Sequence, residues 1–155
     1  MNRIPVRARV LAASATALLL VSSAPAQSAY LVNIATRAPV GGAAGNPIPG
    51  FVLSGAGAKP VLVRAAGPGL GAFGVAGTLA DPRLELFGGA TRQAENDNWS
   101  AADAAVMAKV GAFGFPAGSR DAALIVSLAP GSYTAQVSGV GGLTGDAIIE
   151  VYELP

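Results

Sequence analysis

Short apolar segments that alternate with polar residues, separated by glycine and proline, follow one another along the chain from position 30 onward. In "SYTAQVSG" (132–139), Tyr133, Ala135 and Val137 alternate with polar neighbours, which is the two-residue period of a strand with one buried face. The 21 glycines and 11 prolines fall between such segments, a pattern typical of an all-β domain. We expect strands at 30–36, 49–55, 59–66, 82–88, 90–96, 121–128, 132–139 and 145–154.

One segment departs from this period and predicts a short helix. Residues 101–110 have high helix propensity, and Ser100 before them is a suitable N-cap, with Asp103 as an acidic variant of the capping box. Lys109 suits the last turn of the helix, and Gly111 ends it. We expect this helix to cross from one strand to the next.

Eight strands, tight turns and one short crossover helix predict an all-β fold, a two-sheet β-sandwich of the immunoglobulin-like or jelly-roll type. The segment "LAPGSYTAQV" (128–137) supports this prediction, because its Pro-Gly turn places Tyr133 near the start of a strand. From there the hydroxyl can bond back to the loop backbone, as in the tyrosine corner of Greek-key sandwiches.

Two of the expected strands contain charged residues. In the third strand, Val63 and Ala65 are expected on one face and Arg64 on the opposite face. In the last strand, Glu150 and Glu153 fall on opposite faces, which an edge position or a β-bulge would explain.

Residues 1–26 have the pattern of a secretory signal peptide. Three arginines precede an uncharged apolar run at 10–21, and an A-x-A cleavage pattern ends at Ala26. We expect cleavage after Ala26, or alternatively after Ala29, and a single β-sandwich domain at 27–155. The apolar run has 12 residues whereas a spanning helix needs about 20, so no membrane span is expected after signal removal. The product is expected to be secreted or periplasmic.

The charge balance and two missing residue types limit the functions open to the mature chain. Three of the ten basic residues leave with the signal peptide, so seven basic and nine acidic residues remain and the formal charge is −2. A slightly acidic domain with scattered arginine and lysine lacks the basic surface of a protein that binds nucleic acid. The chain has no cysteine for lipid attachment and no histidine, the usual general base near neutral pH.

The stretch "ENDNW" (95–99) holds oxygen ligands of the kind that Ca²⁺ takes. Glu95, Asp97 and Asn98 are candidate metal ligands, and Asp81 is a further candidate from another part of the chain. The spacing is not that of an EF-hand loop, so the alternative is a turn in which Asn and Asp side chains bond to nearby backbone. The stretch is therefore either a capped turn or a calcium site.

Trp99 also has two interpretations. As the only tryptophan, it is a candidate ligand contact, a platform for a sugar ring or a peptide. Alternatively, it plugs the end of the sandwich core and packs back on the helix that follows Ser100.

The glycine-rich segment "GPGLGAFG" (67–74) contains G-x-G-x-G. A nucleotide-binding version needs a strand, a glycine turn and a helix within a βαβ unit, and Pro68 and the sequence that follows argue for a loop instead. We expect these glycines to allow positive φ and close approach of the backbone.

Without histidine, catalysis would depend on paired carboxylates, as in glycoside hydrolysis. The available side chains are Glu85, Glu95, Asp97 and Asp121. A domain of this size with 6% aromatic residues offers little for a sugar cleft, which makes a carboxylate-dependent hydrolase the weakest alternative.

Two long segments, "TLADPRLELFGGATRQAENDNW" (78–99) and "DAALIVSLAPGSYTAQVSGVGGLTGDAIIEVYEL" (121–154), resemble the bacterial pre-peptidase C-terminal domain (PPC). With "VLVRAAGPGLGAFGV" (61–75), the chain is similar also to a domain of unassigned activity in large exported bacterial proteins. The resemblance covers 30–154 and implies a secreted β-sandwich without catalysis of its own. It also implies a matrix-binding, calcium-bound module, with Asp81, Asp97 and Asn98 at matching positions. The acidic ligands near the start of the calcium-binding members have no counterpart here.

The sequence thus favours an exported non-catalytic binding or adhesion module of the cell envelope or extracellular space. Its partner is expected to be a protein or polysaccharide surface, with 97–99 as the contact and Ca²⁺ as a candidate stabilising ion. The first alternative is a structural or assembly module that packs on a partner chain. The second is a small carboxylate-dependent hydrolase.

Overall fold

The computed structural model describes residues 32–155. The signal peptide predicted at 1–26 and the first two residues of the strand predicted at 30–36 lie outside the described residues. In the described part, no helix combines the length and the apolar character that crossing a membrane requires.

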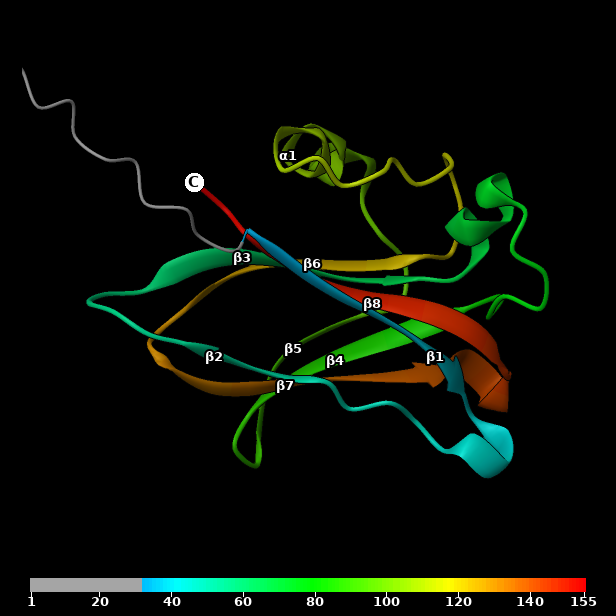
Figure 1. The fold of residues 1–155 in the computed structure, drawn as a ribbon, viewed down its shortest axis with the longest axis horizontal. Coiled ribbons are helices and arrows are strands. Elements are labelled where there is room, and N and C mark those ends of the chain that lie inside the picture. Colours follow the sequence, from blue (N-terminus) through cyan, green and yellow to red (C-terminus); the bar gives the residue numbers. More distant parts are fainter. Residues whose placement is uncertain (1–31) are drawn as a thin grey trace, which may run out of the picture.

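Eight strands form two antiparallel four-stranded sheets that pack face to face, which confirms the predicted β-sandwich (Figure 1). In spatial order, sheet A consists of β1 (Asn33–Val40), β8 (Gly145–Glu153), β3 (Lys59–Ala66) and β6 (Ala122–Leu128). Sheet B consists of β2 (Gly50–Leu53), β7 (Gly131–Gly139), β4 (Pro82–Gly88) and β5 (Thr91–Asn96). In this order β1 and β6 are the edges of sheet A, and β2 and β5 are the edges of sheet B. The chain changes sheet at every connection except the β4–β5 hairpin.

The inter-sheet core comes from the predicted alternation. Val63 of β3, Leu84 and Leu86 of β4, and Val137 of β7 are completely buried, and Ile149 of β8 is nearly so. Each is separated from the next inward residue of its strand by one outward residue, as a two-residue period requires. Burial of this apolar surface is the main contribution to the stability of the sandwich.

A further layer covers the outer face of sheet A. Helix α1 (Ala104–Lys109), the segment 111–121 that follows it and the 3-10 turn Pro68–Phe73 lie over this face (Figure 1). They bury a second apolar cluster, in which Met107 of the helix is 1% exposed. We refer to this layer as the cap. Because the cap lies on one side of β3 and sheet B on the other, residues 61–66 are buried on both faces.

Two charged residues of sheet A are buried, and one expectation about the charges of its strands is wrong. Arg64 points away from Val63 as predicted, but it is fully buried, because its face of the sheet is covered. The edge position or bulge expected for the last strand is wrong, since β8 lies between β1 and β3 in uninterrupted register. Instead, Glu150 is buried directly opposite Arg64, while Glu153 forms an ion pair with Lys59.

Two local predictions are confirmed. The predicted helix begins as a 3-10 turn at Ala101–Asp103 and continues as α1, with the Ser100 hydroxyl accepting a bond from the Ala102 amide at 3.2 Å. Gly111, at a φ of 72°, ends it. The Tyr133 hydroxyl donates to a loop carbonyl four residues earlier at 2.8 Å, which is the expected tyrosine corner.

Candidate functional site

The stretch 95–99 covers the end of β5 and the turn that leads into the cap, and it is hydrogen-bonded to β6. We refer to it as the 95–99 turn. The Asn96 side chain donates to the Asn98 carbonyl at 2.9 Å and accepts from the Ala123 amide at 3.1 Å. Asn98 in turn donates to the Asp97 carboxylate at 3.2 Å. The predicted bonding of Asn and Asp side chains to nearby groups is therefore present, and it closes this side of the sandwich. Asn96 has the central role, although Glu95, Asp97 and Asn98 were the expected site residues.

Two of the three candidate carboxylates, those of Glu95 and Asp81, form ion pairs with arginines. Glu95 lies 2.6 Å from Arg83 and 2.7 Å from Arg92, and together with Asp97 it lines a small surface pocket of about 220 Å³. Asp81, 5% exposed, is bound instead by Arg120 at 2.6 Å. Among residues 32–155, no three acidic side chains lie close enough together to hold a metal ion. The structure thus brings Glu95 and Asp97 to one pocket but directs Asp81 to a separate ion pair.

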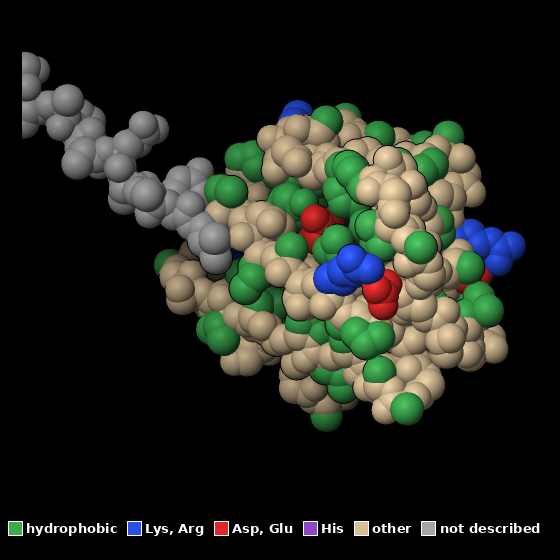
Figure 2. All heavy atoms as spheres, turned by 45° about the vertical axis from the view of Figure 1, so that its right-hand side comes forward, with side chains coloured by type: hydrophobic (Ala, Val, Ile, Leu, Met, Phe, Trp, Pro, Cys, Tyr) green, Lys and Arg blue, Asp and Glu red, His purple; other side chains and the backbone are tan. Residues whose placement is uncertain are grey.

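These ion pairs belong to a surface on which opposite charges alternate. Glu85 bonds to Arg92 at 2.8 Å, and this bond, followed by the charge of Glu95, raises the pKa of Arg92. Figure 2 shows the same tendency on one face of the molecule, where basic and acidic side chains lie next to each other among neutral groups. Exposed pairs of this kind each contribute little to stability.

Calcium binding by Asp81, Glu95, Asp97 and Asn98 stays a prediction. The ion pairs of Glu95 with Arg83 and Arg92 lead us to expect only a weak effect of calcium on stability. Calcium at millimolar concentration should change the melting temperature by less than about 1 °C, because a cation must first displace Arg83 and Arg92 from Glu95. A thermal-melting titration with magnesium as control measures this. A rise of several degrees specific to calcium and lost in Asp97→Asn would establish the metal site instead.

Trp99 is a plug, but of the cap rather than of the inter-sheet core. Its half-buried indole packs edge-to-face on Phe115 with ring centroids 5.7 Å apart, and its Nε1 donates to the Ser119 hydroxyl at 3.1 Å. Its backbone amide donates to the carbonyl of Asp121 at 2.8 Å. These contacts give Trp99 a role in packing the cap. Its contact with a ligand stays a prediction.

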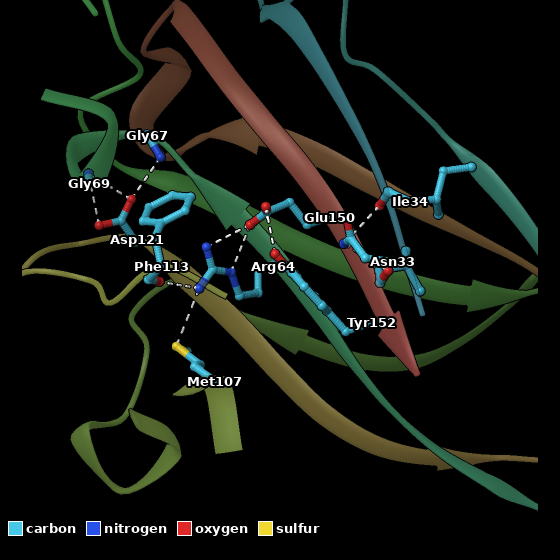
Figure 3. A network of polar contacts seen from close by, with 11 residues as sticks. Asn33, Ile34, Arg64, Gly67, Gly69, Met107, Phe113, Asp121, Glu150 and Tyr152 are labelled. Carbon is cyan, nitrogen blue, oxygen red and sulfur yellow. Dashed lines mark hydrogen bonds and ion pairs between the residues drawn. The ribbon is translucent and has the colours of Figure 1, made fainter. Parts of the chain in front are cut away.

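Asp121 anchors the glycine-rich turn from a fully buried position. Its carboxylate accepts from the Gly67 amide at 2.7 Å and from the Gly69 amide at 3.0 Å (Figure 3). It also accepts from the Ser119 hydroxyl at 2.6 Å. A side chain at Gly69 would approach the carboxylate to 3.1 Å, so the close approach predicted for these glycines is confirmed. The hydrogen bonds of Asp121 thus hold the glycine-rich turn against the start of β6.

The most unusual electrostatic feature is a charge centre beneath the cap. The Arg64 Nε donates to Glu150 Oε2 at 2.9 Å, and Nη2 lies 2.6 Å from the same oxygen, outside the direction of a good hydrogen bond. Nη1 donates to the Phe113 carbonyl at 2.6 Å (Figure 3). The guanidinium also lies 4.4 Å from the Phe113 ring centroid and 4.2 Å from that of Phe115. Such a centre fastens the cap to sheet A through charge and cation–π contacts.

This centre was not predicted, although the sequence contains a signal for it. An arginine interrupts the apolar third strand and a glutamate interrupts the last one, and two opposite charges in strands that pair can neutralise each other. Recognising the pair requires knowledge of which strands are neighbours. Arg64 is 0% exposed, so solvent does not reach it beneath the cap.

Tyr152 completes the charge centre and makes it sensitive to high pH. Its hydroxyl donates to Glu150 Oε1 at 2.9 Å. Burial, and then this hydrogen bond, raise the pKa of Tyr152 to about 12. An unfolded tyrosine titrates near pH 10, so the contribution of Tyr152 to stability is complete below about pH 10 and is lost as the pH rises toward about 12.

Urea unfolding measured between about pH 9 and 11.5 tests this expectation. The free energy of unfolding should fall over this range, and Tyr152→Phe should remove part of the slope. A Tyr152→Phe slope identical to that of the unmodified protein would contradict the assignment.

On the side opposite the 95–99 turn, the edge strands β1 and β2 leave a groove between the two sheets. The groove has a volume of about 340 Å³, and its apolar lining includes Ile34, Phe51 and Val151. We refer to β1, β2 and the residues 47–49 that precede β2 as the open side. Of the seven large apolar side chains exposed in the described residues, four lie on this side or next to it: Val32, Ile34, Ile48 and Val52.

Comparison with known proteins supplies no relative: no protein-family model, curated protein or solved structure matches the chain. The resemblance to the pre-peptidase C-terminal domain therefore stays a prediction, and a functional proposal depends on the surfaces described above.

Proposed function

We propose that this chain is an exported, non-catalytic binding module that acts in the periplasm or outside the cell and holds a partner polypeptide on its open side. The supporting observation is the concentration of exposed apolar side chains beside the groove between β1 and β2. Val52 is 71% exposed and Ile34 is 54% exposed. Contiguous apolar surface of this kind on a folded domain is typical of an interaction site.

A protein partner fits the open side better than a polysaccharide does. Sugar-binding surfaces depend on exposed aromatic rings, and Trp99 is packed against the cap. Phe51, the aromatic residue of the groove, is itself stacked on Tyr133 with ring centroids 5.7 Å apart. The aliphatic side chains that remain accessible favour apolar contacts with a polypeptide.

Absence of catalysis is part of the proposal. Glu85 and Glu95 are held by arginines, and Asp121 is enclosed by hydrogen-bond donors. Paired carboxylates that hydrolyse a glycosidic bond need one group free to donate a proton and space for a sugar between them. These contacts favour a binding role over a hydrolytic one.

A strand-forming peptide tests the proposal. The fluorescently labelled heptapeptide TVTITVT, with apolar residues at alternate positions, should bind the purified protein saturably in a polarisation assay. Ile34→Lys should weaken the affinity by about tenfold or more, because it places a charge in the groove. Ile125→Lys, an equivalent change at an exposed site of β6, serves as the control and should leave binding unchanged. Equal binding by both variants, or no binding at protein concentrations where the protein sediments as a single chain, would exclude the open side as the binding surface.

A further inference from the structure

We infer that the partner on the open side is a second copy of this chain, joined to the first by antiparallel pairing of the two β1 strands. The inference rests on the proposed function, for which it names the partner.

Within the described residues 32–155, the outer edge of β1 has backbone groups that no other strand pairs with. The amide of Glu153 in β8 donates to the Val32 carbonyl at 2.9 Å, in line with the antiparallel register of β1 and β8. Hydrogen-bonded positions alternate along an antiparallel pair, so the even-numbered residues of β1 bond to β8. The N–H and C=O groups of Asn33, Ala35 and Arg37 therefore point away from the sheet. Among the described strands, none pairs with this edge, which makes it a template for another strand.

The stretch available for pairing is short and symmetric about Ala35. Pairing ends before Pro39, which has no N–H group to donate. When Ala35 of one copy faces Ala35 of the other, Asn33 of each copy faces Arg37 of its partner. This arrangement gives three facing pairs with two hydrogen bonds each, none of which needs Pro39. A two-fold interface requires this kind of self-complementarity.

The same register brings apolar side chains together over the groove. Even-numbered side chains of β1 point toward sheet B, as the burial of Val40 in the inter-sheet core demonstrates. In the two-fold register Val32 faces Ala38 of the second copy, and Ile34 faces Thr36. Val32 and Ile34 are now 48% and 54% exposed, and the second copy would cover both.

The charges on this side are compatible with a second copy. Arg37 faces the uncharged Asn33 rather than another arginine, and it already bonds to Asp146 at 2.6 Å. Glu153, at the margin of the groove, is paired with Lys59. Neither like charges nor unpaired charges oppose the association, which agrees with an apolar, isologous interface.

Sedimentation velocity between about 1 and 100 µM tests the inference. The unmodified protein should sediment with twice the mass of one chain at the upper concentrations, and Ile34→Lys should sediment as a single chain. Ile125→Lys, on the opposite edge strand of sheet A, should remain a dimer. Circular dichroism verifies that both variants are folded.

Disulfide trapping tests the register, since the chain has no cysteine of its own. Facing Cα atoms in a hydrogen-bonded pair are about 5.5 Å apart, within the reach of a disulfide. Ala35→Cys should therefore form a covalent dimer under mild oxidation, whereas Arg37→Cys, which faces Asn33, should not. A single chain at about 100 µM, or equal cross-linking of the two cysteine variants, would overturn the inference.

The two proposals fail separately. If the protein is a single chain that still binds the TVTITVT peptide, the second copy is wrong and the binding function stands. If the single chain does not bind the peptide, both proposals are wrong. Because peptide and second copy use the same groove, excess peptide should also convert a dimer to single chains.

Discussion

Glu150→Ala should lower the free energy of unfolding by about 3–5 kcal/mol, because it leaves the guanidinium of Arg64 buried without its counter-ion. Both partners are almost completely buried, at 0% and 6% exposure, so water cannot replace the lost carboxylate. The expected loss is a large fraction of the roughly 5–15 kcal/mol that stabilises an ordinary domain. Chemical denaturation followed by far-ultraviolet circular dichroism measures it.

Glu153→Ala provides a matched control on the same strand. Glu153 also pairs with a basic side chain, Lys59, but both groups are partly exposed, so its removal should cost less than about 1 kcal/mol. The double variant Arg64→Met with Glu150→Leu should recover most of the stability lost in Glu150→Ala, because no buried charge remains. If Glu150→Ala and Glu153→Ala destabilise the protein equally, Arg64 does not depend on Glu150.

Gly67→Ala should cost about 3 kcal/mol or more, or prevent folding, because its new methyl group would overlap a backbone atom. A Cβ at this position would lie 2.1 Å from the Leu79 carbonyl oxygen. Because the contacted atom belongs to the backbone, no side-chain rotation can relieve the contact. The Leu79 side chain is completely buried in the inter-sheet core, which holds this backbone in place. The φ of Gly67 is −122°, outside the left-handed region that favours glycine, so the expected loss is attributed to the contact with Leu79.

Gly71→Ala separates this contact from the general effect of replacing glycine. Gly71 lies in the same turn, has no positive φ, and a Cβ there meets no atom within 4 Å. Both substitutions reduce the entropy of the unfolded chain equally, so Gly71→Ala should be neutral or slightly stabilising. Comparable melting temperatures for the two variants would show that the backbone near Leu79 can move to accommodate a methyl group.

The fold was predictable from local patterns, and the observed strands lie close to the predicted ones. The third strand matches at both ends, and the strand at 82–88 does too. The largest difference is at the first strand, observed at 33–40 instead of the expected 30–36. Alternation identifies strands because it depends only on neighbours in sequence, and glycine and proline mark where each strand ends.

The candidate site was less predictable because it depends on pairing between distant segments. The oxygen-rich stretch was recognised, but the arginines that occupy Glu95 come from β4 and from the start of β5, next to it in the sheet. One of the two interpretations of Trp99 placed it over the inter-sheet core, whereas it packs within the cap. The open side has no signature in the sequence, since Ile34 and Phe51 occupy ordinary inward positions of their strands.

The amino-acid pattern alone was sufficient to establish the class of fold, the number of strands and the tyrosine corner at Tyr133, because each depends on contacts within a few residues. Only the tertiary structure decided that Arg64 is buried, that Glu150 neutralises it and that one side of the sandwich is left open. Alternation separates the two faces of a strand, but it does not specify what covers each face. The number of layers over a sheet depends on how remote segments pack, and that packing decides which charged residues leave water and which apolar residues remain in contact with it.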